Sequence, residues 1–174
     1  MRDLTGPLQS NAISDLMQSV FVAEVLAPSD PLWILSGWIS DIPIIKNDAR
    51  EFSVIDPDWP TGNVLISQVF KTLLSRGGRI ALILRNVEQN QRFVARISAI
   101  KREYPNQIWW FLGEHEHSKG IVGKNFDLSG SMNLTRHGIN INGEHLIYRT
   151  DPEVIAARRI SLTNQWQEAF GANV

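Results

Sequence analysis

Hydrophobic residues follow two different patterns along the chain, and the pattern changes after Gly113. Before this residue, apolar positions spaced three and four apart alternate with short continuous apolar runs, which is typical of helices alternating with buried strands. Helices are predicted at residues 12–26, 64–74 and 87–104, and strands at 32–39, 79–84 and 107–112. The order of these elements predicts an α/β layer whose strands are substantially parallel.

Beyond Gly113 the predicted strands follow one another without helices between them. They are expected at residues 115–123, 126–130 and 143–149, and a helix at 153–170 closes the chain. Asp151 is a candidate N-cap for that helix, with Pro152 just inside it. The predicted fold class is therefore α/β, with a mixed β-sheet flanked by helices on both faces.

Composition narrows the classes of function. Hydrophobic residues make up 43% of the 174 positions and charged residues 20%, which is ordinary for one globular domain. The absence of cysteine excludes disulfides, thiolate nucleophiles and thiolate metal ligands. The sequence shows neither an export signal nor an apolar run of about 20 residues, so we expect a cytoplasmic protein without a membrane span. A formal net charge of −1 restricts any polyanion site to a local patch.

The most specific chemistry lies between His117 and Glu144. His117 and Lys119 stand two residues apart, so on a strand they would project from one face, together with His115, and contact one phosphate. Neutral imidazole is available near pH 7, and phosphorylated imidazole is itself a good leaving group. The Lys119 ammonium and the Asn133 amide would stabilise charge on nonbridging oxygens during an in-line displacement. Such cleavage needs no metal and no other cofactor.

These residues resemble the signature of the phospholipase D superfamily, which is His-x-Lys, an Asp, and a nearby Gly-Ser-x-Asn. The matching residues are His117, Lys119, Gly130, Ser131 and Asn133. In the small bacterial endonucleases of this superfamily, a glutamate eleven positions after the Asn hydrogen-bonds the histidine, and Glu144 stands at that distance. Support of this kind fixes the tautomer and the orientation of an imidazole.

The resemblance implies a role for each matching residue. His117 would be the nucleophile and, from a partner chain, the general acid; Lys119 and Asn133 would bind the phosphate. Ser131 would be a supporting hydrogen-bond donor and Glu144 would orient His117. Because the family brings two motifs to one site and this chain has one, the resemblance also implies a homodimer with both His117 side chains on one phosphate.

The resemblance extends over residues 32–170 of a single domain, 1–174. Residues 1–30 are expected to be an N-terminal helical extension, and residues 46–62, which are rich in turn formers, a loop insertion. One position departs from the signature, because Lys124 stands where the family has its Asp. Asp127 is a candidate for that supporting role.

Several residues allow two interpretations. Glu114-His115-Glu116-His117 has metal-site character, although Lys119 would repel a cation, and His115 is otherwise a pocket or interface residue that contacts substrate. Arg136 and His137 either contact phosphate or lie in a solvated turn. The tryptophan pairs Trp33 and Trp38, and Trp109 and Trp110, either stack on bases or belong to the core.

The function we expect is metal-independent hydrolysis of DNA by an endonuclease that forms a phosphohistidine. The chain is also similar to the phospholipase D-like member of clusters that insert deazaguanine into DNA, which implies partners in a DNA-modification or defence system. Two alternatives stay open. One is a nucleic-acid-binding module without turnover, and the other is phospholipid hydrolysis, for which the 12–26 helix is the candidate membrane-seeking element.

Overall fold

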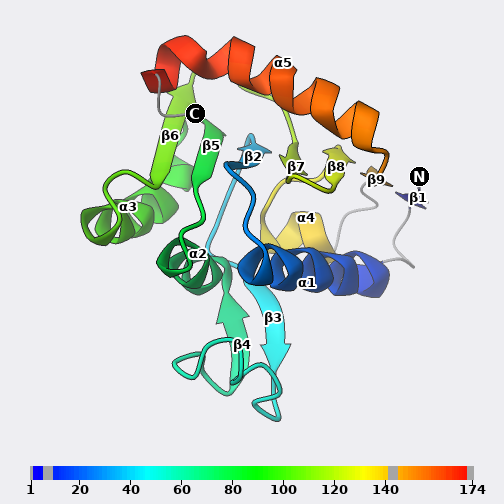
Figure 1. Cartoon of the computed structure of the whole chain (residues 1–174), viewed down its shortest axis with the longest axis vertical. Helices are drawn as coiled ribbons and strands as arrows, with labels where there is room; N and C mark the ends of the chain where they lie inside the picture. The colour runs from blue at the N-terminus through cyan, green and yellow to red at the C-terminus, as the bar shows by residue number, and fades with distance from the viewer. Residues whose placement is uncertain (1, 6–9, 141–144, 172–174) are drawn as a thin grey trace.

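A mixed β-sheet forms the centre of the molecule, seen in the computed structural model, which describes residues 2–5, 10–140 and 145–171. Its seven strands lie in the order β1-β9-β8-β7-β2-β5-β6 (Figure 1). They are β1 (Arg2–Thr5), β2 (Leu32–Ser36), β5 (Ile80–Arg85), β6 (Ile108–Gly113), β7 (Gly120–Val122), β8 (Asp127–Gly130) and β9 (His145–Arg149).

The sheet has a parallel half and an antiparallel half that meet at β2. Strands β2, β5 and β6 run parallel, as the alternation of strands and helices predicts. Strands β7, β8, β9 and β1 are paired antiparallel, beginning with β7 beside β2. All five residues of β2 are buried, because this central strand is covered on both faces.

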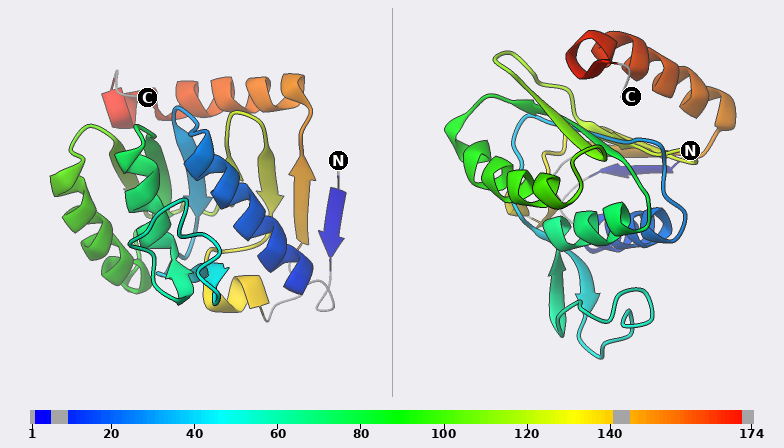
Figure 2. Two further views of the ribbon diagram at one scale, coloured as in Figure 1. Left: turned by 60° about the horizontal axis from the view of Figure 1, so that its bottom comes forward. Right: turned by 60° about the vertical axis from the view of Figure 1, so that its left-hand side comes forward.

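Helices cover both faces of the sheet, which confirms the predicted fold class (Figure 2). One face is covered by α1 (Ser10–Leu26), α2 (Ile66–Ser75), α3 (Glu88–Glu103) and α4 (Arg136–Asn140), and their apolar residues form the larger core with the sheet. The other face is covered by α5 (Pro152–Phe170), which packs Leu162 and Trp166 against Trp33. The predicted N-cap is confirmed, because the Asp151 carboxylate accepts hydrogen bonds from Glu153 N and Val154 N.

Two segments differ from the sequence prediction. The N-terminal extension, expected to be helical, also contributes β1, which pairs with β9 in the register Arg2 to Tyr148. A four-residue strand whose partner residues lie 140 to 146 positions away leaves no periodicity to detect.

Residues 46–62, predicted to be a loop, overlap the end of one strand and the start of another, and these two strands form a second sheet. Strands β3 (Pro43–Asn47) and β4 (Gly62–Leu65) pair antiparallel, and the segment between them projects from the molecule (Figure 1). Buried polar contacts fix this segment: Asn47 Nδ2 donates to Pro60 O at 2.9 Å, and Trp59 Nε1 donates to Thr72 Oγ1 at 2.8 Å.

Candidate active site

The Asn133 side chain and the backbone directly before His117 both lie near Gly37, at the end of β2. A Cβ atom added to Gly37 would lie 3.3 Å from Asn133 Oδ1 and 3.8 Å from the carbonyl oxygen of Glu116. Glu116, the residue directly before His117, and Asn133 therefore both lie near Gly37. A Cβ atom at Gly37 would therefore crowd Asn133 Oδ1 and would lie at van der Waals distance from the Glu116 carbonyl oxygen.

Asn133 is held in a defined orientation. Its Oδ1 accepts a hydrogen bond from Trp38 N at 3.1 Å. A backbone N–H can only donate, so this contact fixes which end of the amide is oxygen. The half-buried side chain thereby keeps its Nδ2 group available as a donor, with no hydrogen bond from Nδ2 to any residue in the described ranges. Such a donor is what a nonbridging phosphate oxygen requires.

Ser36 and Asn90 hold this arrangement, and neither was predicted from the sequence. Ser36 Oγ donates to Trp38 O at 2.7 Å and accepts from Leu134 N at 3.0 Å. Asn90 is fully buried in α3; its Oδ1 accepts from Ile39 N, and its Nδ2 donates to Gly37 O and Arg85 O.

The sequence does carry a signal for Asn90. It shares the buried stripe of α3 with Phe93, Ile97 and Ile100. A polar residue at an apolar position of a helix needs hydrogen-bond partners inside the protein, so Asn90 could have been identified as a positioning residue.

The segment that carries His117 is irregular, and the prediction of a strand from residue 115 is wrong for its first five residues. Strand β7 begins at Gly120. The Glu116 carboxylate accepts a hydrogen bond from Ser118 N at 2.6 Å, so this N–H is not available to a neighbouring strand. His115, His117 and Lys119 therefore do not lie on one strand face as predicted.

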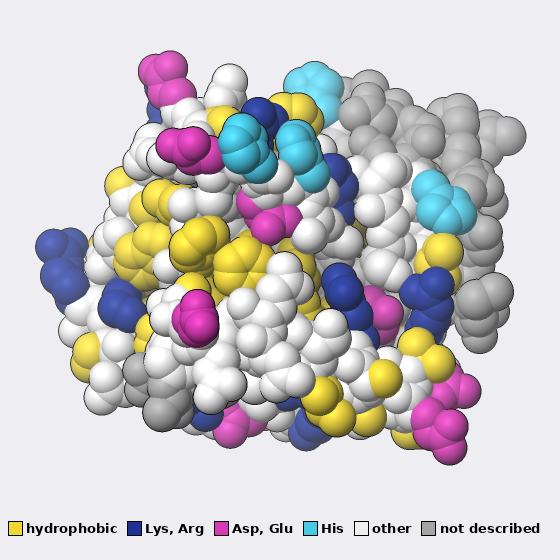
Figure 3. All heavy atoms as spheres, turned by 90° about the horizontal axis from the view of Figure 1, so that it is seen from above, with side chains coloured by type: hydrophobic (Ala, Val, Ile, Leu, Met, Phe, Trp, Pro, Cys, Tyr) yellow, Lys and Arg dark blue, Asp and Glu magenta, His cyan; other side chains and the backbone are white. Residues whose placement is uncertain are grey.

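A different contact brings Lys119 toward His117. Lys119 Nζ donates to the carbonyl oxygen of His117 at 2.9 Å, so the cation lies beside the histidine backbone. His115 and His117 are exposed, and Lys119 is half-buried. Seen from the α5 side, histidine side chains gather along one rim of the molecule, next to charged side chains and a hydrophobic patch (Figure 3).

Gly130 and Ser131 connect the end of β8 to the start of β9. Ser131 N donates to His145 O at 2.9 Å, and Ser131 Oγ accepts from His145 N at 3.0 Å. A Cβ atom at Gly130 would overlap the His145 carbonyl oxygen, so glycine is required there. The predicted orienter Glu144 lies outside the described residues. The contacts of Ser131 give it a structural function; its role as a donor to substrate stays a prediction.

The position that departs from the signature is remote from His117. Lys124 follows the far end of β7; its N donates to Ser29 Oγ at 2.7 Å and its Nζ to Pro28 O at 3.4 Å. Asp127 pairs with Val122, whereas Ser129 pairs with Gly120 near Lys119, so Asp127 also lies at the end of the strand away from the histidine. The replacement therefore does not alter the immediate surroundings of His117.

Asp127 takes part in a buried contact on the α5 side. It is 4% exposed, and its Oδ2 lies 3.6 Å from Arg149 Nη1. Burial raises the pKa of Asp127 above its usual value, an effect that the nearby Arg149 and Arg158 partly offset. This environment indicates a structural residue of the β8–β9 region.

The remaining candidates lie around this site. Arg136 and His137 are exposed at the start of α4. Trp33 is fully buried, whereas Trp38, beside Asn133, is 43% exposed. No cluster of three or more His, Asp or Glu side chains suited to a metal occurs in the described part of the chain. Among the helices of that part, none combines the length and apolarity needed to cross a membrane.

The fold is shared with three solved structures, one of which is a phospholipase D family member. NucT from Helicobacter pylori has a TM-score of 0.57 at 12% identity, with 94% of this chain and 92% of that chain covered. Nuc from Salmonella typhimurium, a phospholipase D family member, has a TM-score of 0.53 at 14% identity, with 86% of each chain covered. TrmBL2, an archaeal chromatin protein with a novel mode of DNA binding, has a TM-score of 0.52 at 11% identity, with 96% of this chain and 52% of that chain covered.

No family model matches this chain, and no curated protein matches it. The chain thus has the fold of Nuc and NucT, and the residues of the site must carry any argument about its chemistry.

Proposed function

We propose that this protein is a phosphodiesterase of the phospholipase D superfamily that hydrolyses DNA without a metal ion. The observation that carries this proposal is that Asn133 and the Glu116 backbone, directly before His117, both lie near Gly37, in a fold shared with a phospholipase D family member. Two motif segments separated in sequence are thereby brought to the carboxyl end of β2, the usual position of a ligand site in such sheets.

The proposed reaction has two displacements at phosphorus. An imidazole nitrogen of His117 attacks the phosphorus, the P–O bond to the leaving group breaks, and the second His117 gives its proton to the leaving oxygen. Water then attacks the phosphorus of the phosphohistidine and loses its proton to the second His117. The P–N bond breaks, which releases the first His117. Lys119 and the Asn133 Nδ2 group stabilise the equatorial oxygens. Ser131 supports this set, and Glu144 orients His117.

The proposed site requires two copies of the chain. Each chain supplies one His117, and the exposure of this residue leaves it accessible to a partner. His115 and Arg136, which are also exposed, are proposed to contact the substrate backbone. A twofold arrangement would bring two identical motifs to one phosphate.

Binding to DNA is supported by the likeness to TrmBL2, a DNA-binding chromatin protein. We propose a cytoplasmic role in a DNA-modification or defence system, as implied by the resemblance to the deazaguanine clusters. The likeness to TrmBL2 also favours a second candidate function, a DNA-binding module without turnover.

Plasmid cleavage in the presence of EDTA tests the proposal. Wild-type protein is expected to nick plasmid, and His117→Ala to abolish nicking. Lysines at the two ends of β7 give a matched pair: Lys119→Ala is expected to lower the rate by about 100-fold or more, as for loss of a transition-state donor, whereas Lys124→Ala is expected to retain it. Binding of plasmid without any cleavage would instead support the second candidate.

A further inference from the structure

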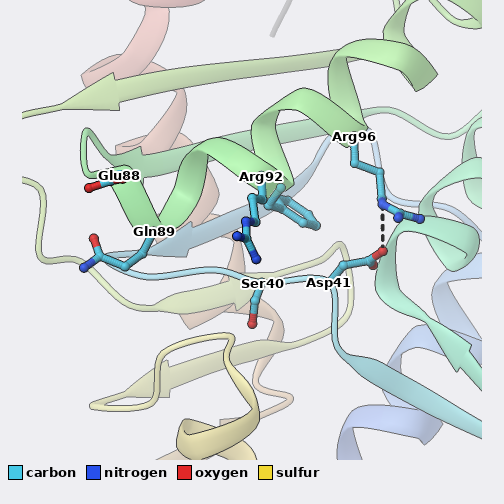
Figure 4. A pocket seen from close by; sticks show the side chains of 7 residues that line it. Ser40, Asp41, Glu88, Gln89, Arg92 and Arg96 are labelled. Atoms are coloured by element: carbon cyan, nitrogen blue, oxygen red, sulfur yellow. Dashed lines mark ion pairs between the residues drawn. The ribbon is translucent and has the colours of Figure 1, made fainter.

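A groove made of two neighbouring hollows begins beside the candidate active site. Its first part, a hollow of about 380 Å³, is lined by Trp38, Ser40, Gln89 and His137 among others. Its second part, of about 610 Å³, is lined by Ser40, Asp41, Glu88, Gln89, Arg92 and Arg96 among others (Figure 4). Because Ser40 and Gln89 belong to both parts, the two hollows adjoin. We refer to this surface, from Trp38 to Arg96, as the Arg92 groove.

The groove begins at the motif asparagine. Trp38 N donates to Asn133 Oδ1 at 3.1 Å, and Thr135, which lines the first hollow, donates its N–H to Asn133 O at 2.8 Å. A phosphate bound by Asn133 would therefore lie close to the mouth of the groove. The chain of a polymeric substrate must continue from that phosphate in both directions.

Arg92 is a cation in the groove that is free to bind a ligand. Arg96 Nε lies 3.1 Å from Asp41 Oδ2, so its charge is already compensated. Arg92 is exposed, forms no ion pair with any residue of the described ranges, and extends into the hollow toward Ser40 (Figure 4). A guanidinium and a hydroxyl that face one cavity are suited to a phosphate group.

Trp38 adds an aromatic surface at the other end of the groove. It is 43% exposed, although Trp33, five positions earlier, is fully buried. A large aromatic side chain that stays in solvent beside a phosphate site is typical of surfaces that stack on bases. Backbone contacts hold the residue in place, because Ser36 Oγ donates to Trp38 O while Trp38 N binds Asn133.

We propose that the Arg92 groove binds unpaired nucleotides that flank the cleaved phosphodiester. Trp38 stacks on a base next to the reacting phosphate, and Arg92 contacts a neighbouring phosphate. This inference rests on the proposed function and adds a substrate class to it. Bases in a duplex are stacked within the helix, so a strand must be unpaired locally to place a base on Trp38, and single-stranded DNA binds better than duplex.

Binding of a short fluorescein-labelled DNA strand, measured by anisotropy in EDTA, tests the groove. Trp38→Ala is expected to weaken binding roughly fivefold or more, with Trp38→Phe retaining most of the affinity. Arg92→Ala is expected to weaken binding and to reduce the slope of log K against log salt by about 0.7, the value for one phosphate contact with a single strand. Arg102→Ala is the matched control, because Arg102 is an exposed arginine of α3 outside the groove.

Two outcomes would contradict the proposal that the Arg92 groove binds unpaired nucleotides. One is equal affinity of the Trp38→Ala, Arg92→Ala and Arg102→Ala variants, each shown to be folded by its circular dichroism spectrum. The other is equal affinity of wild-type protein for the single strand and for its duplex.

Hydrolysis of bis(p-nitrophenyl) phosphate separates the groove from the chemistry, because this diester has no flanking nucleotides. Hydrolysis that depends on His117, together with equal DNA affinity of all variants, would reject the groove and keep the proposed function. Weakened binding of the Trp38→Ala and Arg92→Ala variants, without hydrolysis of the diester by wild type, would keep the groove and reject the catalytic function.

Discussion

Glu24 places a buried carboxylate next to the position where the phospholipase D signature has its aspartate. It belongs to α1, is 3% exposed, and accepts hydrogen bonds from Ser29 N at 2.9 Å and Ser29 Oγ at 2.8 Å. Ser29 Oγ in turn accepts from Lys124 N at 2.7 Å. The region around Lys124 thus contains a carboxylate from another element, which no motif search of the 117–133 segment would find.

The protonation of Glu24 is expected to make stability depend on pH. Burial raises the pKa of Glu24 above its usual 4.5, outweighing the hydrogen bonds from Ser29. The folded state therefore binds this proton more tightly than the unfolded state does. The stabilisation that results is complete below about pH 4.5, and it is lost as the pH rises through the pKa of Glu24 in the folded state. In the Glu24→Gln variant this loss does not occur.

The measurement is the melting temperature of both proteins between about pH 4.5 and pH 7. The melting temperature of the Glu24→Gln variant minus that of wild type is expected to become more positive as pH rises, where about 2–4 °C corresponds to roughly 1 kcal/mol. Glu168→Gln, at an exposed position of α5, serves as the control with a constant difference. A difference for Glu24→Gln that is also constant would contradict the assignment.

Single residues also show where sequence patterns stop being informative. Trp33 and Trp38 occupy one apolar run, yet one is in the core and the other in solvent. The fully buried strand ends at Ser36, and Trp38 follows it after Gly37, outside the strand that is covered on both faces. Hydrophobicity alone could not distinguish them, because the distinction depends on the Asn133 and Asn90 contacts from distant parts of the chain.

At the scale of elements, the helices and parallel strands could be predicted because each leaves a local pattern. Helix α3 was predicted at 87–104 and spans Glu88–Glu103, with its stripe of apolar residues and Pro105 after it. Strand β1 and the irregular 114–119 segment could not be predicted. The first depends on a distant partner, and the second on a side-chain hydrogen bond from Glu116.

The connection of α3 to the β2–β3 segment is expected to depend on Asn90. Asn90→Ala would leave Ile39 N, Gly37 O and Arg85 O without their partner. Buried groups of this kind cost about 1–3 kcal/mol each, so we expect a loss of about 3 kcal/mol or more in the free energy of unfolding, measured in urea. Without the hydrogen bond from Asn90 Nδ2, Gly37 is expected to shift, and this shift is expected to lower the hydrolytic rate.

Asn164→Ala provides the comparison for Asn90. Asn164 is exposed on α5, so its replacement is expected to change stability by no more than about 0.5 kcal/mol. If the two variants were equally stable, the bridge from α3 would be energetically unimportant, and the geometry at Gly37 would have to be maintained by Ser36.

At the scale of the whole molecule, the candidate site lies where the parallel and antiparallel halves of the sheet meet. Strand β2 is parallel to β5 and antiparallel to β7, so its carboxyl end is flanked by the 114–119 segment and by the residues after β8. The sequence indicated both the motif and the parallel strands. It could not indicate that Asn133 binds Trp38, a contact across 95 positions that requires the folded sheet.

A shared site makes a quantitative prediction for mixtures of wild-type and His117→Ala chains. If two His117 side chains act on one phosphate, a mixed dimer has one imidazole and is inactive. After random exchange of subunits in an equimolar mixture, about a quarter of dimers are wild type on both sides, so activity falls to about a quarter of that of the all-wild-type sample at the same total concentration. Chains that act alone would give about half.

The assay is hydrolysis of bis(p-nitrophenyl) phosphate after the two chains are unfolded together and refolded, with separately refolded and then combined samples as the control for exchange. Activity proportional to the wild-type fraction would show that one chain completes the chemistry by itself, and a second proton donor would then have to be found within the same subunit, where exposed His115 is the first candidate.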